Sequence, residues 1–214
     1  MLKPDALRRR LRFYFITDDQ AEGFSALEQV RVAIEAGATM VQYRNKSFQL
    51  TDYATVEAIC RYCQVRRVPF VVNDHPLLAR AVGADGVHVG QDDTPPQLAR
   101  RIMGPRAIVG VSVSSLAELE RTELTDCDYI GTGPIFPTGT KPDAKTVQGL
   151  SGLQSMAARS PLPVVAIGGI GPGRARDCFA HGAAGVAVIS CISRAANPIK
   201  AATAMADACN VSSV

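Results

Sequence analysis

Short apolar runs rich in β-branched and aromatic residues recur along the chain, and each is followed by a segment with the apolar period of a helix. The runs predict strands at residues 13–17, 39–43, 69–73, 86–89, 107–111, 128–131, 163–167 and 185–189. The helical segments lie near residues 24–36, 51–67, 76–82, 95–103, 115–123, 150–158, 172–180 and 196–208. This alternation predicts an α/β fold, a (β/α)8 TIM barrel, because parallel strands need crossover helices that cover the sheet.

The main alternative to a barrel is a doubly wound open sheet. In dinucleotide-binding sheets of that kind a G-x-G-x-x-G turn follows the first strand, whereas here the turn reads TDDQAEGF. No shift in composition and no Ser/Gly-rich linker divides the sequence. We therefore expect a single barrel domain over residues 1–214, with residues 1–11 as an N-terminal leading segment.

The composition is that of a folded protein rather than a disordered one. Of its 214 residues 47% are hydrophobic, and 23 Lys and Arg against 20 Asp and Glu give a net charge of +3. That charge is too small to indicate nucleic acid as a partner, and no apolar run approaches the ~18 residues that a membrane span requires. The six cysteines lack the spacing of a disulfide scaffold. We expect a cytoplasmic protein that acts on small molecules, and the sequence leaves homo-oligomer formation open.

The second predicted strand ends in polar residues at alternating positions, Gln42, Arg44 and Lys46. While the strand continues, these three side chains point to one face, and Val41 and Tyr43 point to the helices. The active site of a barrel lies at the carboxyl ends of its strands, so the polar set is placed at the barrel mouth. Two cations there predict an anionic ligand, because a buried unpaired charge is costly. A salt bridge to a carboxylate of the protein is the alternative.

Acidic residues follow the third and fourth predicted strands at the same end of the barrel. Asn73 and Asp74 come at the end of the third strand, and Asp93 lies just beyond the fourth. Neighbouring strands lie about 5 Å apart, so the two carboxylates can converge on one ion. Oxygen ligands without a His or Cys cluster favour Mg²⁺, which completes its shell with water and substrate phosphates. The alternative is that each aspartate caps the helix that follows it.

A long loop rich in glycine and proline, residues 133–149, follows the sixth predicted strand. Its Thr138, Thr140 and Lys141 carry hydroxyl and ammonium donors suited to phosphate oxygens. A loop of this length inside a compact domain is usually functional, and we interpret it as a mobile lid that orders around a phosphorylated ligand.

The turns after strands seven and eight form a second candidate anion site. In barrels these turns often bind phosphate through backbone N–H groups. Gly168 and Gly169 after strand seven allow the close backbone approach that this requires, and strand eight ends at Ile189 and Ser190. One basic site with a metal and one backbone site imply two phosphorylated ligands.

Seven short motifs follow one another in barrel order: VQYRNK, VVND, GVHVGQDD, GVS, GPIFPTGTK, AIGGI and VISCIS. In this order they resemble the thiamine phosphate synthase (thiamine-phosphate pyrophosphorylase) family, from about residue 13 to about residue 199. Each motif alone is weak, but the seven in sequence are specific. The resemblance implies a barrel transferase that joins hydroxymethylpyrimidine diphosphate to hydroxyethylthiazole phosphate, using Mg²⁺ and releasing pyrophosphate.

The resemblance also implies a role for each candidate residue. The residues that match the pyrimidine diphosphate site are Gln42, Arg44, Lys46, Asn73, Ser112 and Lys141. The residues that match the thiazole phosphate site are Thr138, Thr140, Gly169, Ile189 and Ser190, with Gly168 beside them. Asp74 and Asp93 match the metal ligands. The predicted catalytic residues are Arg44, Lys46, Ser112 and Lys141.

The chain departs from the family pattern at two places. Asn45 stands where the family commonly has Glu, and Val113 and Ser114 stand where many members have a Thr/Ala-His pair. Neither departure touches the residues matched to the substrates or the metal. They bear on local packing and kinetics rather than on the reaction.

Some signals are set aside. Cys60 and Cys63 form a C-x-x-C in a predicted helix without a thioredoxin-like context. His88 is interpreted as a packed barrel histidine, and the basic residues within 8–12 as a solvated stretch.

Three alternative functions are weighed against a synthase. A thiazole tautomerase, a relative within the resemblance, needs no diphosphate or metal, and the Asp74 and Asp93 pair argues against it. A non-catalytic barrel that binds thiamine phosphates would show no Mg²⁺-dependent turnover. Another phosphate-binding barrel enzyme, such as an aldolase or isomerase, would leave the two carboxylates unexplained.

Overall fold

The structure, a computed structural model, describes residues 4–139 and 146–210. Its eight parallel strands form a closed ring in which each strand pairs with the next and β8 pairs with β1. The strands are β1 (Phe13–Ile16), β2 (Met40–Tyr43), β3 (Phe70–Asn73), β4 (Gly86–Val89), β5 (Ile108–Ser112), β6 (Tyr129–Thr132), β7 (Val164–Ile167) and β8 (Gly185–Val188). The barrel prediction is confirmed, and a closed ring excludes the open sheet.

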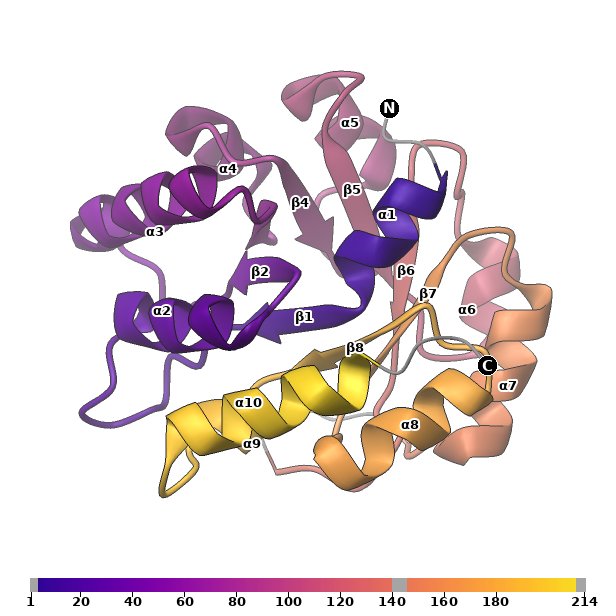
Figure 1. The fold of residues 1–214 in the computed structure, drawn as a ribbon. Helices are drawn as coiled ribbons and strands as arrows, with labels where there is room; N and C mark the ends of the chain where they lie inside the picture. Colours follow the sequence, from indigo (N-terminus) through magenta and orange to yellow (C-terminus); the bar gives the residue numbers. More distant parts are fainter. Residues whose placement is uncertain (1–3, 140–145, 211–214) are drawn as a thin grey trace.

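Helices alternate with the strands and surround the sheet (Figure 1). They are α2 (Ala26–Ala36), the 3-10 turn η1 (Leu50–Asp52), α3 (Tyr53–Arg66), α4 (Pro76–Val82), α5 (Pro96–Met103), α6 (Leu116–Arg121), α7 (Gly149–Arg159), α8 (Pro172–Ala180) and α10 (Pro198–Cys209). Local chemistry sets their ends: α2 begins with a reciprocal capping box between Ser25 and Glu28 and ends at Gly37, whose φ is +115°. No helix in the described part of the chain is long and apolar enough to cross a membrane.

The strand residues divide into two apolar layers because successive side chains point to opposite faces. Phe13 and Phe15 of β1 pack outward, in the large cluster between the sheet and the helices. Tyr14 and Ile16 point inward and join a second cluster inside the barrel. The inner layer becomes polar toward the carboxyl ends of the strands, where Gln42 follows Met40 on β2.

Two short helices were not among the predicted segments, α1 (Pro4–Leu11) and α9 (Ser190–Ser193). The residues expected as a leading segment form α1, which lies across one opening of the barrel in Figure 1. Its Leu7 and Leu11 are buried in the inner cluster. Apolar residues therefore close the amino-terminal end of the barrel, while the three arginines at positions 8–10 stay exposed.

Gly110 of β5 leaves space for an aromatic ring inside the barrel. A Cβ atom at this position would lie 2.2 Å from the ring of Tyr129, far closer than van der Waals contact allows. The side chain of Tyr129 is completely buried there. The missing side chain on β5 thus allows a phenol from β6 to reach the barrel axis.

Candidate active site

A cavity of about 820 Å³ opens at the carboxyl ends of the strands. The predicted site residues that line it are Arg44, Lys46, Asn73, Asp74, Asp93, Ser112, Thr138, Gly168, Gly169, Ile189 and Ser190. Gln42 lies below it, in a smaller cavity of about 40 Å³. Thr140 and Lys141 fall outside the described residues. Residues from seven strand ends thus meet in one place, as the fold prediction required.

The exit of β2 carries the basic side of the cavity. The amide N–H of Arg44 donates to the hydroxyl of Thr17 at 2.8 Å, and that hydroxyl donates back to the Arg44 carbonyl at 3.2 Å. The end of β1 therefore fixes the backbone from which Arg44 and Lys46 reach the cavity. Val41 and Tyr43 belong to the outer cluster, so the predicted alternation of faces is confirmed.

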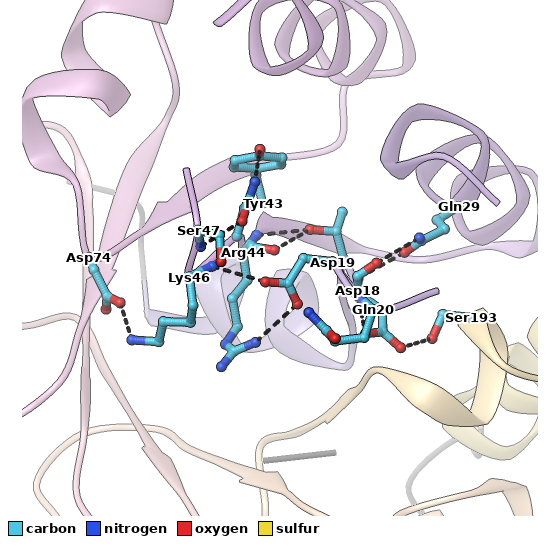
Figure 2. Close-up of polar contacts among 12 residues, drawn as sticks. Asp18, Asp19, Gln20, Gln29, Tyr43, Arg44, Lys46, Ser47, Asp74 and Ser193 are labelled. Atoms are coloured by element: carbon cyan, nitrogen blue, oxygen red, sulfur yellow. Dashed lines mark hydrogen bonds and ion pairs between the residues drawn. The ribbon is translucent and has the colours of Figure 1, made fainter. Parts of the chain in front are cut away.

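Both basic side chains have carboxylate partners (Figure 2). The Lys46 ammonium donates to Asp74 at 2.5 Å, and the Arg44 guanidinium lies 3.8 Å from Asp19. The salt-bridge alternative is thus present in this structure. It does not remove the cations from the cavity, since Arg44 and Lys46 still line it, and the Lys46 side chain is 54% exposed.

Asp74 sits on a strained backbone at the end of β3. Its φ is +63°, which is uncommon for a residue other than glycine, and the His75 N–H donates across it to the Asn73 carbonyl at 2.8 Å. Its own N–H donates to the His88 carbonyl of β4. The helix α4 has His75 at its N-cap, so Asp74 does not cap it. Strain of this kind is typical of functional positions.

Asp93 comes back toward Asp74 from the loop after β4. Its carboxylate accepts the Gly90 N–H at 2.8 Å, and Pro95 rather than Asp93 is the N-cap of α5. The capping alternative is therefore excluded for both aspartates. A side chain at position 90 would collide with the Asp93 carboxylate, because a Cβ atom there would lie 2.6 Å from Oδ2.

The carboxyl groups of Asp74 and Asp93 are in hydrogen-bond contact. Burial raises the pKa of Asp74, and the neighbouring Asp93 carboxyl raises it further. For Asp93, burial is outweighed by the hydrogen bonds from Asp74 and from the Gly90 N–H, which hold its pKa below the ordinary value. The contact between the two carboxyl groups thus drives their pKa values apart, while the Lys46 ammonium beside Asp74 acts to lower both.

This donor set fits a magnesium ion better than a transition metal. Two carboxylates that repel each other present hard oxygen ligands, and a divalent cation relieves that repulsion. Among residues 4–139 and 146–210, no group of three His, Cys, Asp or Glu side chains is arranged to hold a metal. Mg²⁺ usually binds one or two carboxylates and completes its shell with water and phosphate oxygens, which is what Asp74 and Asp93 leave room for.

The opposite wall of the cavity is built from backbone after β7 and β8. Gly168 and Gly169 have φ values of +99° and +63°. A Cβ atom would lie 2.6 Å from Pro134 in the first case and 2.5 Å from the Pro137 carbonyl in the second. Arg174 of α8, which the sequence analysis missed, donates to the Gly169 carbonyl at 2.8 Å and also lines the cavity.

A chain of buried hydrogen bonds runs through the barrel beneath the cavity. Gln42 donates to the Tyr14 hydroxyl at 2.7 Å, and this hydroxyl lies 2.9 Å from that of Tyr129. His88 Nδ1 lies 3.0 Å from the Tyr129 hydroxyl, and Nε2 lies 2.9 Å from Ser112 Oγ. The chain therefore connects two predicted substrate residues on β2 and β5. His88 is packed, as predicted, but it also orients Ser112.

A protein-family model described as thiamine monophosphate synthase matches residues 13–192 of the chain. The chain belongs to the thiamine monophosphate synthase family. The family predicted from the seven motifs is thereby confirmed.

Curated relatives and a solved structure agree with this. Thiamine-phosphate synthase from Chloroflexus aurantiacus is 45% identical over 184 residues, which cover 85% of this chain and 84% of that protein. The thiamine biosynthesis bifunctional protein ThiM/ThiE from Symbiobacterium thermophilum is 42% identical over 204 residues, which are 94% of this chain but 41% of that protein. Thiamine phosphate pyrophosphorylase from Pyrococcus furiosus has a TM-score of 0.86 at 37% identity, over 95% of this chain and 97% of that chain.

The departure from the thiamine phosphate synthase pattern at Asn45 has a structural account. Its side-chain amide donates to the Tyr43 hydroxyl at 3.3 Å and to Asp52 at 3.1 Å, and its oxygen accepts the Ser47 N–H at 2.8 Å. Asn45 thus braces the loop after β2 against η1. It is not among the described residues that line the cavity.

The C-x-x-C of α3 lies in the apolar cluster between the sheet and the helices. Cys60 and Cys63 are free thiols buried against the sheet. Burial raises the pKa of Cys60 to about 11 and that of Cys63 further, so both stay protonated near neutral pH. A packing role accounts for this pair.

Proposed function

We propose that this chain acts as a thiamine-phosphate synthase, a transferase that joins hydroxymethylpyrimidine diphosphate to hydroxyethylthiazole phosphate and yields thiamine phosphate and pyrophosphate. One observation carries the proposal. A single cavity has an acidic pair with two cations on one wall and glycine-rich backbone on the other. The cavity can therefore hold a diphosphate at one wall and a monophosphate at the other, and the reaction requires both substrates to be bound side by side.

The basic wall suits the diphosphate. Arg44 and Lys46 line the cavity beside Asp74 and Asp93, and the family resemblance adds Lys141. Cations placed where negative charge develops on the leaving pyrophosphate lower the barrier to its departure. Bound at Asp74 and Asp93, Mg²⁺ would supply further electrostatic stabilisation of the diphosphate oxygens.

The lower part of the cavity suits the pyrimidine ring. Asn73 and Ser112 border both cavities, and Gln42 lies in the smaller one. The bond that breaks joins the diphosphate oxygen to a methylene carbon on an electron-rich aminopyrimidine. Because that ring can stabilise a carbocation, we infer that pyrophosphate departs before the new bond forms. Gln42, Asn73 and Ser112 then hold the ring in place.

The backbone wall suits the thiazole phosphate. Gly168, Gly169, Ile189 and Ser190 line it, and Thr138 at the start of the long loop adds a hydroxyl. The resemblance adds Thr140, which lies with residues 141–145 of the predicted lid outside the described residues. The thiazole nitrogen attacks with its lone pair and carries no proton, so the chemistry needs no general base.

Pyrophosphate release by the purified protein tests the proposal. Release that requires both substrates and Mg²⁺, with thiamine phosphate as product, supports it. Binding of thiazole phosphate without release would favour the tautomerase or the non-catalytic barrel, and isomerase activity on a thiazole phosphate tautomer separates those two.

The proposal makes the two small-molecule substrates the partners and places the protein in the cytoplasm. Light scattering on the purified protein decides between a monomer and a homo-oligomer.

A further inference from the structure

The chain leaves β1 through two adjacent aspartates whose carboxylates point in opposite directions (Figure 2). Asp18 contacts the segment after β8, and Asp19 contacts the segment after β2. Both segments line the cavity, whereas neither aspartate is among the described residues that do so. The two carboxylates therefore lie behind two different walls of one site.

Asp18 ties the segment after β8 to the rest of the barrel. Its carboxylate accepts the Ser193 hydroxyl at 2.7 Å and two nitrogens of Arg194 at 2.7 and 3.0 Å. Gln29 of α2 hydrogen-bonds both the N–H and the carbonyl of Asp18. The Asp18 side chain is 2% exposed, so the carboxylate that anchors α9 is itself held rigidly.

Asp19 does the same for the segment after β2. One of its oxygens accepts the Lys46 N–H at 3.0 Å, and the other lies 3.8 Å from the Arg44 guanidinium. Its side chain is 13% exposed, and the preceding Thr17 fixes the Arg44 backbone. Both predicted diphosphate ligands are thus held from the end of β1.

We propose that Asp18 and Asp19 are positioning residues, and that each one positions the binding site of a different substrate. Asp18 holds the wall that begins at Ser190 for the thiazole phosphate, and Asp19 holds Arg44 and Lys46 for the pyrimidine diphosphate. This inference rests on the proposed function. One dipeptide at the end of β1 sets the positions of both phosphate subsites, because the closed ring makes β1 a neighbour of both β2 and β8.

A purely electrostatic role for Asp19 predicts the opposite result. A carboxylate 3.8 Å from Arg44 repels an incoming diphosphate, so its removal would then tighten binding. A positioning role predicts weaker binding, because an unanchored loop loses conformational entropy when the substrate orders it. The sign of the change in KM therefore separates the two.

Steady-state kinetics with each substrate varied in turn test Asp19 through two variants. Asp19→Ala removes the acceptor of the Lys46 N–H, whereas Asp19→Asn removes the charge and keeps an acceptor. We expect Asp19→Ala to raise KM for the pyrimidine diphosphate about fivefold or more, with KM for the thiazole phosphate within about twofold. Asp19→Asn should restore much of the loss. A lower KM in Asp19→Ala overturns the proposal.

Asp18 calls for a milder companion variant, because its loss could unfold the protein. Asp18→Asn and Ser193→Ala both weaken the anchor of α9, and Ser193→Ala removes a single hydrogen bond. Both should raise KM for the thiazole phosphate, about fivefold and about twofold, and leave KM for the pyrimidine diphosphate nearly unchanged. If the variants raise KM equally for the two substrates, the assignment of Asp18 to the thiazole phosphate site is overturned.

Asp128→Asn is the matched control for lost stability. Asp128 is a half-buried carboxylate paired with Arg100 at 2.7 Å, and it precedes β6 at the end of the barrel opposite the cavity. Its variant should lower the melting temperature without changing either KM selectively. If Asp128→Asn raises KM for only one substrate, and by as much as the Asp18 or Asp19 variants do, the inference is overturned.

Two reference variants keep the inference distinct from the proposed function. Arg44→Ala should raise KM for the pyrimidine diphosphate, and Thr138→Ala should raise KM for the thiazole phosphate. If these references act on the wrong substrate, the subsite assignment fails. If they act as expected while Asp18 and Asp19 variants show no selectivity, the positioning inference alone fails.

Discussion

The hydroxyl groups of Tyr14 and Tyr129 meet 2.9 Å apart inside the barrel, although 115 positions separate them in the chain. Burial raises the pKa of both phenols well above the ordinary value, so each keeps its proton. Each hydroxyl can thus donate one hydrogen bond and accept others. The pair lets Gln42 at one side of the barrel and Ser112 at the other share one continuous hydrogen-bond chain.

Removing the Tyr129 hydroxyl should therefore weaken both stability and turnover. We expect Tyr129→Phe to lower the free energy of unfolding by about 1–3 kcal/mol, because Tyr14 and His88 each lose a buried hydrogen bond. Urea denaturation measures this loss, and kcat should fall with it because His88 orients Ser112. The control is Tyr62→Phe, whose hydroxyl contacts Glu35 at the surface. Equal losses in the two variants would contradict the prediction.

Asp74 and Asp93 should control the magnesium requirement. With one carboxylate replaced, Asp74→Asn or Asp93→Asn should need at least about tenfold more Mg²⁺ for half-maximal activity, an effect of about 1.4 kcal/mol or more. Titration of pyrophosphate release with Mg²⁺ checks this. Asp92→Asn makes the same charge change next to Asp93, and it should leave the Mg²⁺ requirement nearly unchanged. A shift as large in Asp92→Asn would show that charge alone matters.

The leaving-group assignment can be tested on two cations from different loops. Arg44→Ala and Lys141→Ala should each lower kcat/KM at least about tenfold, or about 1.4 kcal/mol. Arg61→Ala removes an exposed arginine that pairs with Glu57 on α3, and it should have no such effect. Full activity in both test variants would show that the assignment is wrong.

The Asp18 anchor predicts how stability responds to acid. Burial would raise the pKa of Asp18, but hydrogen bonds from Arg194 and Ser193 outweigh it and hold the pKa below its ordinary value of 3.8. A depressed pKa contributes stability that is complete above the unfolded-state pKa and is lost as the pH falls through the folded-state value. The melting temperature of the wild type should therefore fall more steeply below about pH 4 than that of Asp18→Asn. Parallel slopes in thermal melts from pH 7 to pH 3 would contradict this.

The barrel could be predicted from sequence because each strand and helix is long enough to show its own period. The helix α9 could not, since four residues cover barely one turn and give no apolar repeat. The helix α1 was not predicted because its three arginines outnumber its two buried leucines, Leu7 and Leu11, and so obscure the apolar pattern. The helix α1 packs on β1 and on the distant β8, and α9 packs on α10 and on the distant α2, so both depend partly on contacts far away in the chain.

Most of the candidate site could be predicted for a related reason. Polar residues at strand ends are visible in the sequence, and the topology alone brings Asp74 and Asp93 together. The hydrogen bond between Asp18 and Ser193 spans 175 positions and depends on the ring closing between β1 and β8. The apolar pattern of β1 also does not show whether Tyr14 only packs its ring or forms hydrogen bonds through its hydroxyl as well. Such contacts require the three-dimensional register of the strands.

Because α1 covers the amino-terminal end of the barrel, ligands can enter only from the carboxyl ends of the strands. In a site that is open at one end only, the ligand that binds first occupies the deepest position, and a ligand bound above it blocks its exit. On the proposed assignment the pyrimidine lies toward Gln42 and Tyr14, beneath the thiazole phosphate, so the diphosphate has to load first. Product-inhibition patterns report this order, and random loading would show that the ligands pass one another.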